Sequence, residues 1–129
     1  MKPLLNLTIQ RKWLDMIASG EKREEYRFAD NRQIEAVFTG RRGHESPFVC
    51  LRAGYRMDSE SIVVKCNDIS IRNCDPKSPF YSGRGGPNKE WGEWAGDHYV
   101  LHLGKVLKRG SYAECRAWMD GYTPRRSPR

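Results

Sequence analysis

The sequence lacks several patterns that would assign it to a whole class of proteins. Its four cysteines include no Cys-x-x-Cys pair, so the paired spacing of zinc-binding modules is missing. No apolar run is long enough to cross a membrane, the first residues lack the pattern of a secretion signal, and no internal repeat is present. We therefore expect a cytoplasmic protein with reduced thiols, no metal or other cofactor, and no membrane partner.

Residues that often bind metals do not gather in the sequence either. Cys50 and Cys66 lie within apolar runs and are interpreted as small core residues. His98 and His102 share one face of a predicted strand, but no third ligand accompanies them. We interpret both histidines as surface residues.

Length and charge favour a single basic domain. A chain of 129 residues can bury its own core, and its net charge of +7 favours polyanionic partners such as RNA or DNA. Part of that charge follows Pro124 near the end of the chain, at Arg125, Arg126 and Arg129. We predict one domain over residues 1–121 and a flexible basic tail over residues 122–129.

A charged stretch at residues 20–27, with the sequence Gly-Glu-Lys-Arg-Glu-Glu-Tyr-Arg, joins two segments with regular apolar patterns. Gly20 is expected to end a helix there, because glycine adopts the left-handed conformation at little cost. The charges then lie where a helix ends and a strand begins. The helix is predicted from apolar residues at i, i+4, i+7 and i+8, namely Ile9, Trp13, Met16 and Ile17.

The strand after the helix separates its charges from its aromatic residues. Glu25 and Arg27 share one face, whereas Tyr26 and Phe28 share the other. We expect the aromatic pair to face the core, which turns the charged pair toward the helix or a cleft beside it. Lys22, in the turn, would join the charged pair in one polar site. The alternative is a solvated ladder of ion pairs on an edge strand.

Four further residues are candidates for the same cleft. Arg11 and Lys12 fall in the first turn of the predicted helix, where the helix dipole disfavours positive charge. They either face an anionic ligand or are tolerated surface charges. Gly54 predicts a bend in the strand around it, which would turn Tyr55 and Arg56 toward the cleft.

The remaining pattern predicts a curled sheet and a final helix. The apolar parity of the longest strand changes at Asn67 and Asp68, which predicts a bulge of the kind that curls a sheet into a small barrel. Ser111 and Glu114 form a capping-box pattern that begins a helix, and Gly121 ends it. Strands are predicted over residues 4–9, 48–55, 61–72 and 98–107.

A long irregular segment at residues 74–97 is rich in glycine and proline. It combines aromatic and basic residues, a mixture that suits single-stranded nucleic acid. Trp91 and Trp94 either stack on bases or pack the loop against the barrel. Within the segment, the aromatic loop 77–96 is alternatively a docking surface for a protein partner.

The charged stretch resembles the signature of a known family. Gly20, Lys22, Glu25 and Arg27 fill the four fixed positions of G-x-K-x-x-E-x-R, as in the ASCH domain, a small β-barrel related to the PUA fold. The resemblance covers roughly residues 4–107 and implies an α+β fold, a PUA-like (ASCH) small mixed β-barrel with flanking helices. Other segments resemble a branch common in phage and bacterial genomes; they are residues 11–17, 51–55, 63–66, 90–92 and 99–104.

The resemblance implies binding of RNA or a nucleotide, in RNA processing or modification. Lys22 and Arg27 would hold phosphate or base oxygens, and Glu25 would accept a hydrogen bond from an exocyclic amine or orient the two cations. A base would stack on an aromatic ring. The candidates for stacking are Tyr26, Tyr55 and Trp91, and the further candidate ligand contacts are Arg11, Lys12 and Arg56.

Two other functions remain open. Some small family members are amidohydrolases that act on acetylated cytidine; they are similar in having lysine at the position of Lys22, but they have threonine where this chain has Glu25. A hydrolase, either a metal-independent ribonuclease or a modified-nucleoside amidohydrolase, would use Lys22 and Glu25 as its catalytic pair. A protein-interaction module would instead use the aromatic loop 77–96.

Overall fold

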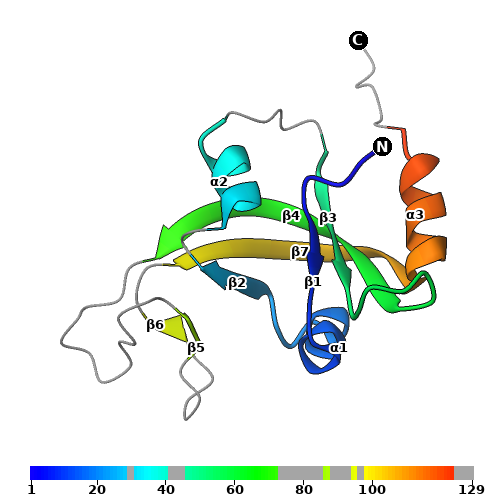
Figure 1. The fold of residues 1–129 in the computed structure, drawn as a ribbon, viewed down its shortest axis with the longest axis horizontal. Coiled ribbons are helices and arrows are strands. Elements are labelled where there is room, and N and C mark those ends of the chain that lie inside the picture. The colour runs from blue at the N-terminus through cyan, green and yellow to red at the C-terminus, as the bar shows by residue number, and fades with distance from the viewer. Residues whose placement is uncertain (29–30, 41–45, 73–85, 88–93, 96–97, 124–129) are drawn as a thin grey trace.

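The computed structural model describes residues 1–28, 31–40, 46–72, 86–87, 94–95 and 98–123. In this part of the chain, three helices accompany a five-stranded sheet (Figure 1). The strands of the sheet are β1 (Asn6–Thr8), β2 (Glu24–Phe28), β3 (Phe48–Arg52), β4 (Glu60–Arg72) and β7 (His98–Ser111). The helices are α1 (Arg11–Ser19), α2 (Arg32–Phe38) and α3 (Tyr112–Asp120).

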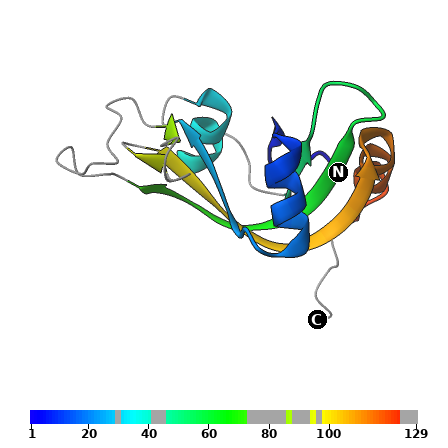
Figure 2. The ribbon, with the colours of Figure 1, turned by 90° about the horizontal axis from the view of Figure 1, so that it is seen from below.

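The strand order is β1-β3-β4-β7-β2, so β1 and β2 form the two edges of the sheet. Only β1 and β3 run parallel; the other neighbours in this sheet are antiparallel. A separate two-stranded ladder pairs β5 (Gly86–Pro87) with β6 (Trp94–Ala95). The long strands β4 and β7 curve beneath α1 and α2, which gives a half-barrel (Figure 2). Among the described helices, none has the length and apolarity that crossing a bilayer requires.

Irregular pairing of β4 with β7 produces the curl. The register shifts between Val63 and Val64, between Val64 and Cys66, and between Cys66 and Asp68. The last shift confirms the bulge that the parity change predicts. Each shift bends and twists the pair locally. After it, Ile69 returns to the face of Val64 and packs against the same core, whereas Cys66 is only half-buried there.

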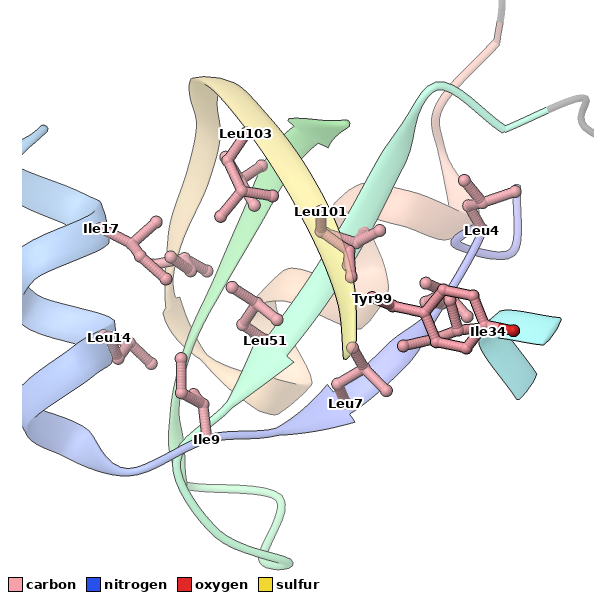
Figure 3. Packing of buried hydrophobic residues seen from close by; sticks show 14 of the residues in the cluster. Leu4, Leu7, Ile9, Leu14, Ile17, Ile34, Leu51, Tyr99, Leu101 and Leu103 are labelled. Atoms are coloured by element: carbon pink, nitrogen blue, oxygen red, sulfur yellow. The ribbon is translucent and has the colours of Figure 1, made fainter. Parts of the chain in front are cut away.

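The main core lies on the concave side of the sheet. Leu14 and Ile17 of α1, and Ile34 of α2, are at most 3% exposed and pack toward Leu101 of β7 (Figure 3). We call the face of the sheet that carries this core the inner face. Leu5, Leu7 and Ile9 add the buried side of the first strand segment, as the alternation there predicts.

Helix α1 ends where its sequence predicts. Gly20 has a φ of 86°, in the left-handed region, and its N–H donates to Ile17 O at 3.1 Å. The buried face of the helix is centred on Leu14 and Ile17, while Trp13 is only partly buried. Ile9 precedes the helix. Because the predicted apolar face included Ile9, it is displaced from the face that the helix buries.

A second, smaller core lies on the opposite face of β3 and β4. Phe48 and Cys50 pack there against Cys115 and Met119 of α3. Burial raises the pKa of the Cys50 thiol to about 12, as expected for a packing residue. The Tyr122 ring lies 5.1 Å from the Phe48 ring, centroid to centroid, so packing continues beyond Gly121 into the first residue of the predicted tail.

The capping box at the start of α3 gives a first testable prediction. Ser111 Oγ accepts from Glu114 N, and Glu114 Oε1 accepts from Ser111 N, both at 3.1 Å. Ser111→Ala is expected to lower the free energy of unfolding by about 1 kcal/mol, measured by urea denaturation. Ser111→Asp keeps an acceptor and should lose less. Equal losses in the two variants would show that the cap contributes nothing.

Candidate functional site

Three charged side chains of the motif meet on the inner face of β2. Glu25 pairs in register with Leu101 and is 4% exposed. Its Oε1 lies 3.1 Å from Lys22 Nζ, and its Oε2 lies 3.6 Å from Arg27 Nη1. The turn that brings Lys22 back is held by its own N–H, which donates to Met16 O at 3.0 Å. The convergence predicted from the sequence is therefore present.

Lys22 is an enclosed cation rather than a solvated one. Its side chain is 13% exposed, and Nζ donates to the Glu24 carbonyl as well as to Glu25. The same atom lies 4.6 Å from the ring centroid of Tyr26 and 5.6 Å from that of Trp13. The alternative of a solvated ion-pair ladder is wrong for these residues, because the side chains of Lys22, Glu25 and Arg27 are only 13%, 5% and 21% exposed.

The Glu25 carboxylate keeps one unused acceptor. Oε1 also accepts from Tyr26 N at 3.0 Å. Oε2 is buried and has no hydrogen-bond partner among the described residues. A buried acceptor without a donor costs about 1–3 kcal/mol, so a donor brought close to this oxygen would be held favourably.

Arg27 is committed partly to the backbone. Its Nη2 donates to Thr8 O at 2.6 Å, and its Nη1 to Tyr26 O at 3.3 Å. Thr8 belongs to β1, so this side chain of one edge strand binds the other edge strand. The guanidinium is 21% exposed and sets one wall of the cluster.

Tyr26 does not take the core position that the alternation predicts. It lies on the opposite, outer face of the sheet, where its hydroxyl donates to Glu24 Oε1 at 2.7 Å. Burial and the Glu24 carboxylate raise the pKa of Tyr26 to about 12. Alternation assigns residues to two faces, but the helices decide which face carries the main core, and here they cover the side of Glu25.

His98 also differs from the prediction. It is 2% exposed, and its ring meets the edge of the Tyr26 ring at 5.7 Å between centroids. The His102 side chain shares its face but is about one-third exposed, so only one of the two is a surface histidine. In the part of the chain that the structure describes, no three potential metal ligands cluster.

The cations in the first turn of α1 have partners within the protein. Arg11 Nε lies 3.1 Å from Asp15 Oδ1, one turn along the helix. Lys12 Nζ lies 4.7 Å from the Trp13 ring centroid. Both side chains are exposed, and among the described residues neither forms a hydrogen bond or ion pair with Lys22, Glu25 or Arg27.

The structure does not bring Tyr55 and Arg56 to the cluster. Tyr55 is 83% exposed, and Arg56 pairs with Asp58 at 3.0 Å in the same hairpin. The hairpin is tied to the start of α3, where Tyr112 N donates to Ser59 O at 2.8 Å. That is the opposite end of β7 from the residues that pair with β2. Trp91 and most of the aromatic loop 77–96 lie outside the described residues.

A pocket of about 350 Å³ opens beside Lys22. The end of α1, the turn after it and residues 103–106 of β7 line it, and its cations are Lys22, Arg23 and Lys105. None of its lining residues is a carboxylate. Arg23 and Lys105 are exposed, and the described residues include no ion-pair partner for either.

Sequence reasoning missed Arg23 and Lys105. Arg23 falls between the fixed positions of the motif, and its carbonyl accepts from Leu103 N at 2.8 Å, which fixes the turn against β7. Lys105 follows Gly104, which is exposed at the pocket. A glycine followed by lysine inside a strand pattern was the available signal.

Comparison of the chain with protein-family models, curated proteins and solved structures found no match.

Proposed function

We propose that this protein binds RNA or a nucleotide, with a phosphate group in the pocket beside Lys22. The observation that carries the proposal is the lining of that pocket, with three cations and no carboxylate. Such a surface attracts an anion, and guanidinium and ammonium groups form strong charge-assisted hydrogen bonds with phosphate. Its volume lies within the usual range for small-ligand sites.

The roles of the lining residues follow from their burial. Arg23 and Lys105 are exposed and would contact the phosphate directly. Lys22 is held by Glu25 beneath them and would supply a fixed positive charge. Glu25 does not line this pocket, and its role there would be to hold Lys22 in place.

We further propose that the half-barrel is an ASCH domain of the PUA-like kind, of the phage and bacterial branch, acting in RNA processing or modification. The motif G-x-K-x-x-E-x-R supports this, since its Lys22, Glu25 and Arg27 converge between α1 and β2. The same geometry makes the hydrolase the second choice. A general base must offer a lone pair, whereas Lys22 Nζ faces two acceptors and two aromatic rings.

The test is a titration of the full chain with nucleoside 5′-monophosphates, the matching nucleosides and short single-stranded RNAs, followed by NMR chemical shifts. We expect shifts at the pocket residues with nucleotides and RNA, and much weaker shifts with nucleosides. Arg23→Ala and Lys105→Ala should each weaken binding by roughly 10-fold or more, the loss expected for a charge-assisted hydrogen bond. Each should also reduce the salt dependence of RNA binding by about one phosphate contact.

The matched control is Arg116→Ala, which removes one exposed cation from α3 and leaves the pocket unchanged. It should lose only a little non-specific affinity. Equal losses in Arg116→Ala and Lys105→Ala would mean that net charge, and not the pocket, attracts RNA. Chemical-shift changes confined to the aromatic loop would contradict binding at the pocket and would favour recognition of a protein or a base by that loop.

A further inference from the structure

A second group of polar side chains lies on the outer face of the sheet, turned away from the main core. Ser70 of β4, His102 of β7 and Glu24 of β2 stand in line across three adjacent strands. Ser70 Oγ lies 2.8 Å from His102 Nε2. His102 Nδ1 lies 3.6 Å from Glu24 Oε2. A hydroxyl, an imidazole and a carboxylate thus stand in the order that activates a serine nucleophile, with a hydrogen bond at the first contact and a longer electrostatic contact at the second.

The fold fixes this alignment through register. Glu24 and His102 are direct cross-strand partners, so their side chains share a face. On the other side, His102 is opposite Asp68, and Ser70 is its diagonal neighbour. The bulge between Cys66 and Asp68 sets this register, and therefore places the Ser70 hydroxyl against the ring of His102.

Glu24 is held as a carboxylate by its other contacts. Arg72 donates to both oxygens, at 3.0 and 3.4 Å, and the Tyr26 hydroxyl donates to Oε1 at 2.7 Å. The hydrogen bonds from Arg72 and Tyr26 lower the pKa of Glu24. A carboxylate beside Nδ1 favours the imidazole tautomer with its proton on Nδ1, which leaves Nε2 free to accept the Ser70 proton.

We propose that Ser70, His102 and Glu24 form a second site, in which Ser70 acts as a nucleophile toward small carboxylic esters. The site is separate from the pocket at Lys22, because Glu24 and Glu25 point to opposite faces of β2. His102 and Glu24 are about one-third exposed, so the open face admits a small acyl group.

Hydrolysis of an ester at this site requires only these groups and water. Ser70 Oγ bonds to the ester carbonyl carbon while its proton passes to His102 Nε2. The carbon–oxygen bond to the alcohol then breaks, and the alcohol leaves with the proton from His102. Water attacks the acyl-serine by the same route and releases the acid. Arg72 is half-exposed on this face, where it supplies a positive charge beside Glu24.

The first experiment treats the full chain with a fluorophosphonate reagent and locates the adduct by peptide mass spectrometry. We expect one adduct per chain, on Ser70. Hydrolysis of p-nitrophenyl acetate should fall by on the order of 10²–10⁴-fold in Ser70→Ala and in His102→Gln. Ser59→Ala is the matched control, because Ser59 is partly buried like Ser70 but lies next to the other end of β4, where its hydroxyl oxygen accepts from Arg56 N at 3.0 Å.

Glu24 is a positioning residue, so its test is spectroscopic. In Glu24→Gln, the ¹⁵N spectrum of the His102 imidazole should show loss of the Nδ1–H tautomer preference, which a merely structural role would not change. Labelling of the unmodified chain does not depend on any variant folding. An adduct absent from Ser70, or equal ester hydrolysis in Ser70→Ala and Ser59→Ala, would overturn the proposal.

Discussion

Replacing Lys22 with alanine is expected to lower the free energy of unfolding by about 3 kcal/mol. The substitution leaves the Glu25 carboxylate, 4% exposed, without its nearest cation. Removing one member of a buried ion pair typically costs 3–5 kcal/mol, because the remaining charge stays desolvated. We expect the lower end, since Arg27 Nη1 and Tyr26 N still face the carboxylate. Chemical denaturation of the purified variant measures the loss.

A double-mutant cycle separates burial from loss of contacts. Glu25→Gln removes the buried charge, so the Lys22→Ala, Glu25→Gln variant should be more stable than the sum of the single losses predicts. Arg11→Ala is the control, because it breaks an ion pair with Asp15 whose side chains are 59% and 49% exposed. That loss should stay below about 0.5 kcal/mol. Similar losses at Lys22 and Arg11 would contradict the enclosed cluster.

The stability effect determines how the motif must be probed. A ligand-binding assay on Lys22→Ala mixes loss of contact with loss of fold. Arg23 and Lys105 are exposed, and their replacement leaves the cluster unchanged. These two residues therefore test binding, whereas Lys22 and Glu25 test how the site is supported.

Replacing Phe48 with alanine is expected to cost about 4 kcal/mol. Phe48 is fully buried, and its ring lies 5.6 Å from the Trp118 ring and 5.1 Å from the Tyr122 ring, between centroids. Large-to-small changes of buried aromatic residues cost about 3–5 kcal/mol through lost burial and the cavity that remains. Because this second core holds α3 on β3, the loss should appear first as faster amide hydrogen exchange in α3.

The matched control for Phe48 is Phe38, an exposed aromatic residue of similar size. Phe38 is 43% exposed and meets the Tyr99 ring at 5.7 Å between centroids. Phe38→Ala should cost roughly 1 kcal/mol, the value of an aromatic pair outside a core. If Phe48→Ala costs no more than Phe38→Ala, α3 does not depend on the second core.

Local features of the fold could be predicted from the sequence because their causes are local. Gly20 ends α1 in the left-handed conformation, and Gly54, with a φ of 131°, makes the expected bend. The capping box of α3 has both of its hydrogen bonds. The change of apolar parity at Asp68 marks a register shift, since a bulge moves every later side chain to the other face.

Features that depend on distant segments could not be predicted. Alternation along β2 separates Glu25 from Tyr26, but the placement of α1 decides that Glu25 is the enclosed residue. Burial of His98 likewise depends on the Tyr26 ring, which another strand supplies. The pocket cations were missed because Lys105 approaches Arg23 only through the pairing of β7 with the turn.

The place of β2 beside β7 has a consequence for the order of folding. Phe28 pairs with His98, so β2 can join the sheet only after the chain has reached a strand that begins seventy residues later. The pairing closes a long loop, and the chain loses conformational entropy on closing it before the contacts between the two strands can stabilise the pair. During synthesis the motif would leave the ribosome with Glu25 still hydrated, and the cluster would be enclosed only when β7 arrives. The charged residues of β2 are thus made well before the strand that encloses them, and their cluster is assembled only when the two strands pair.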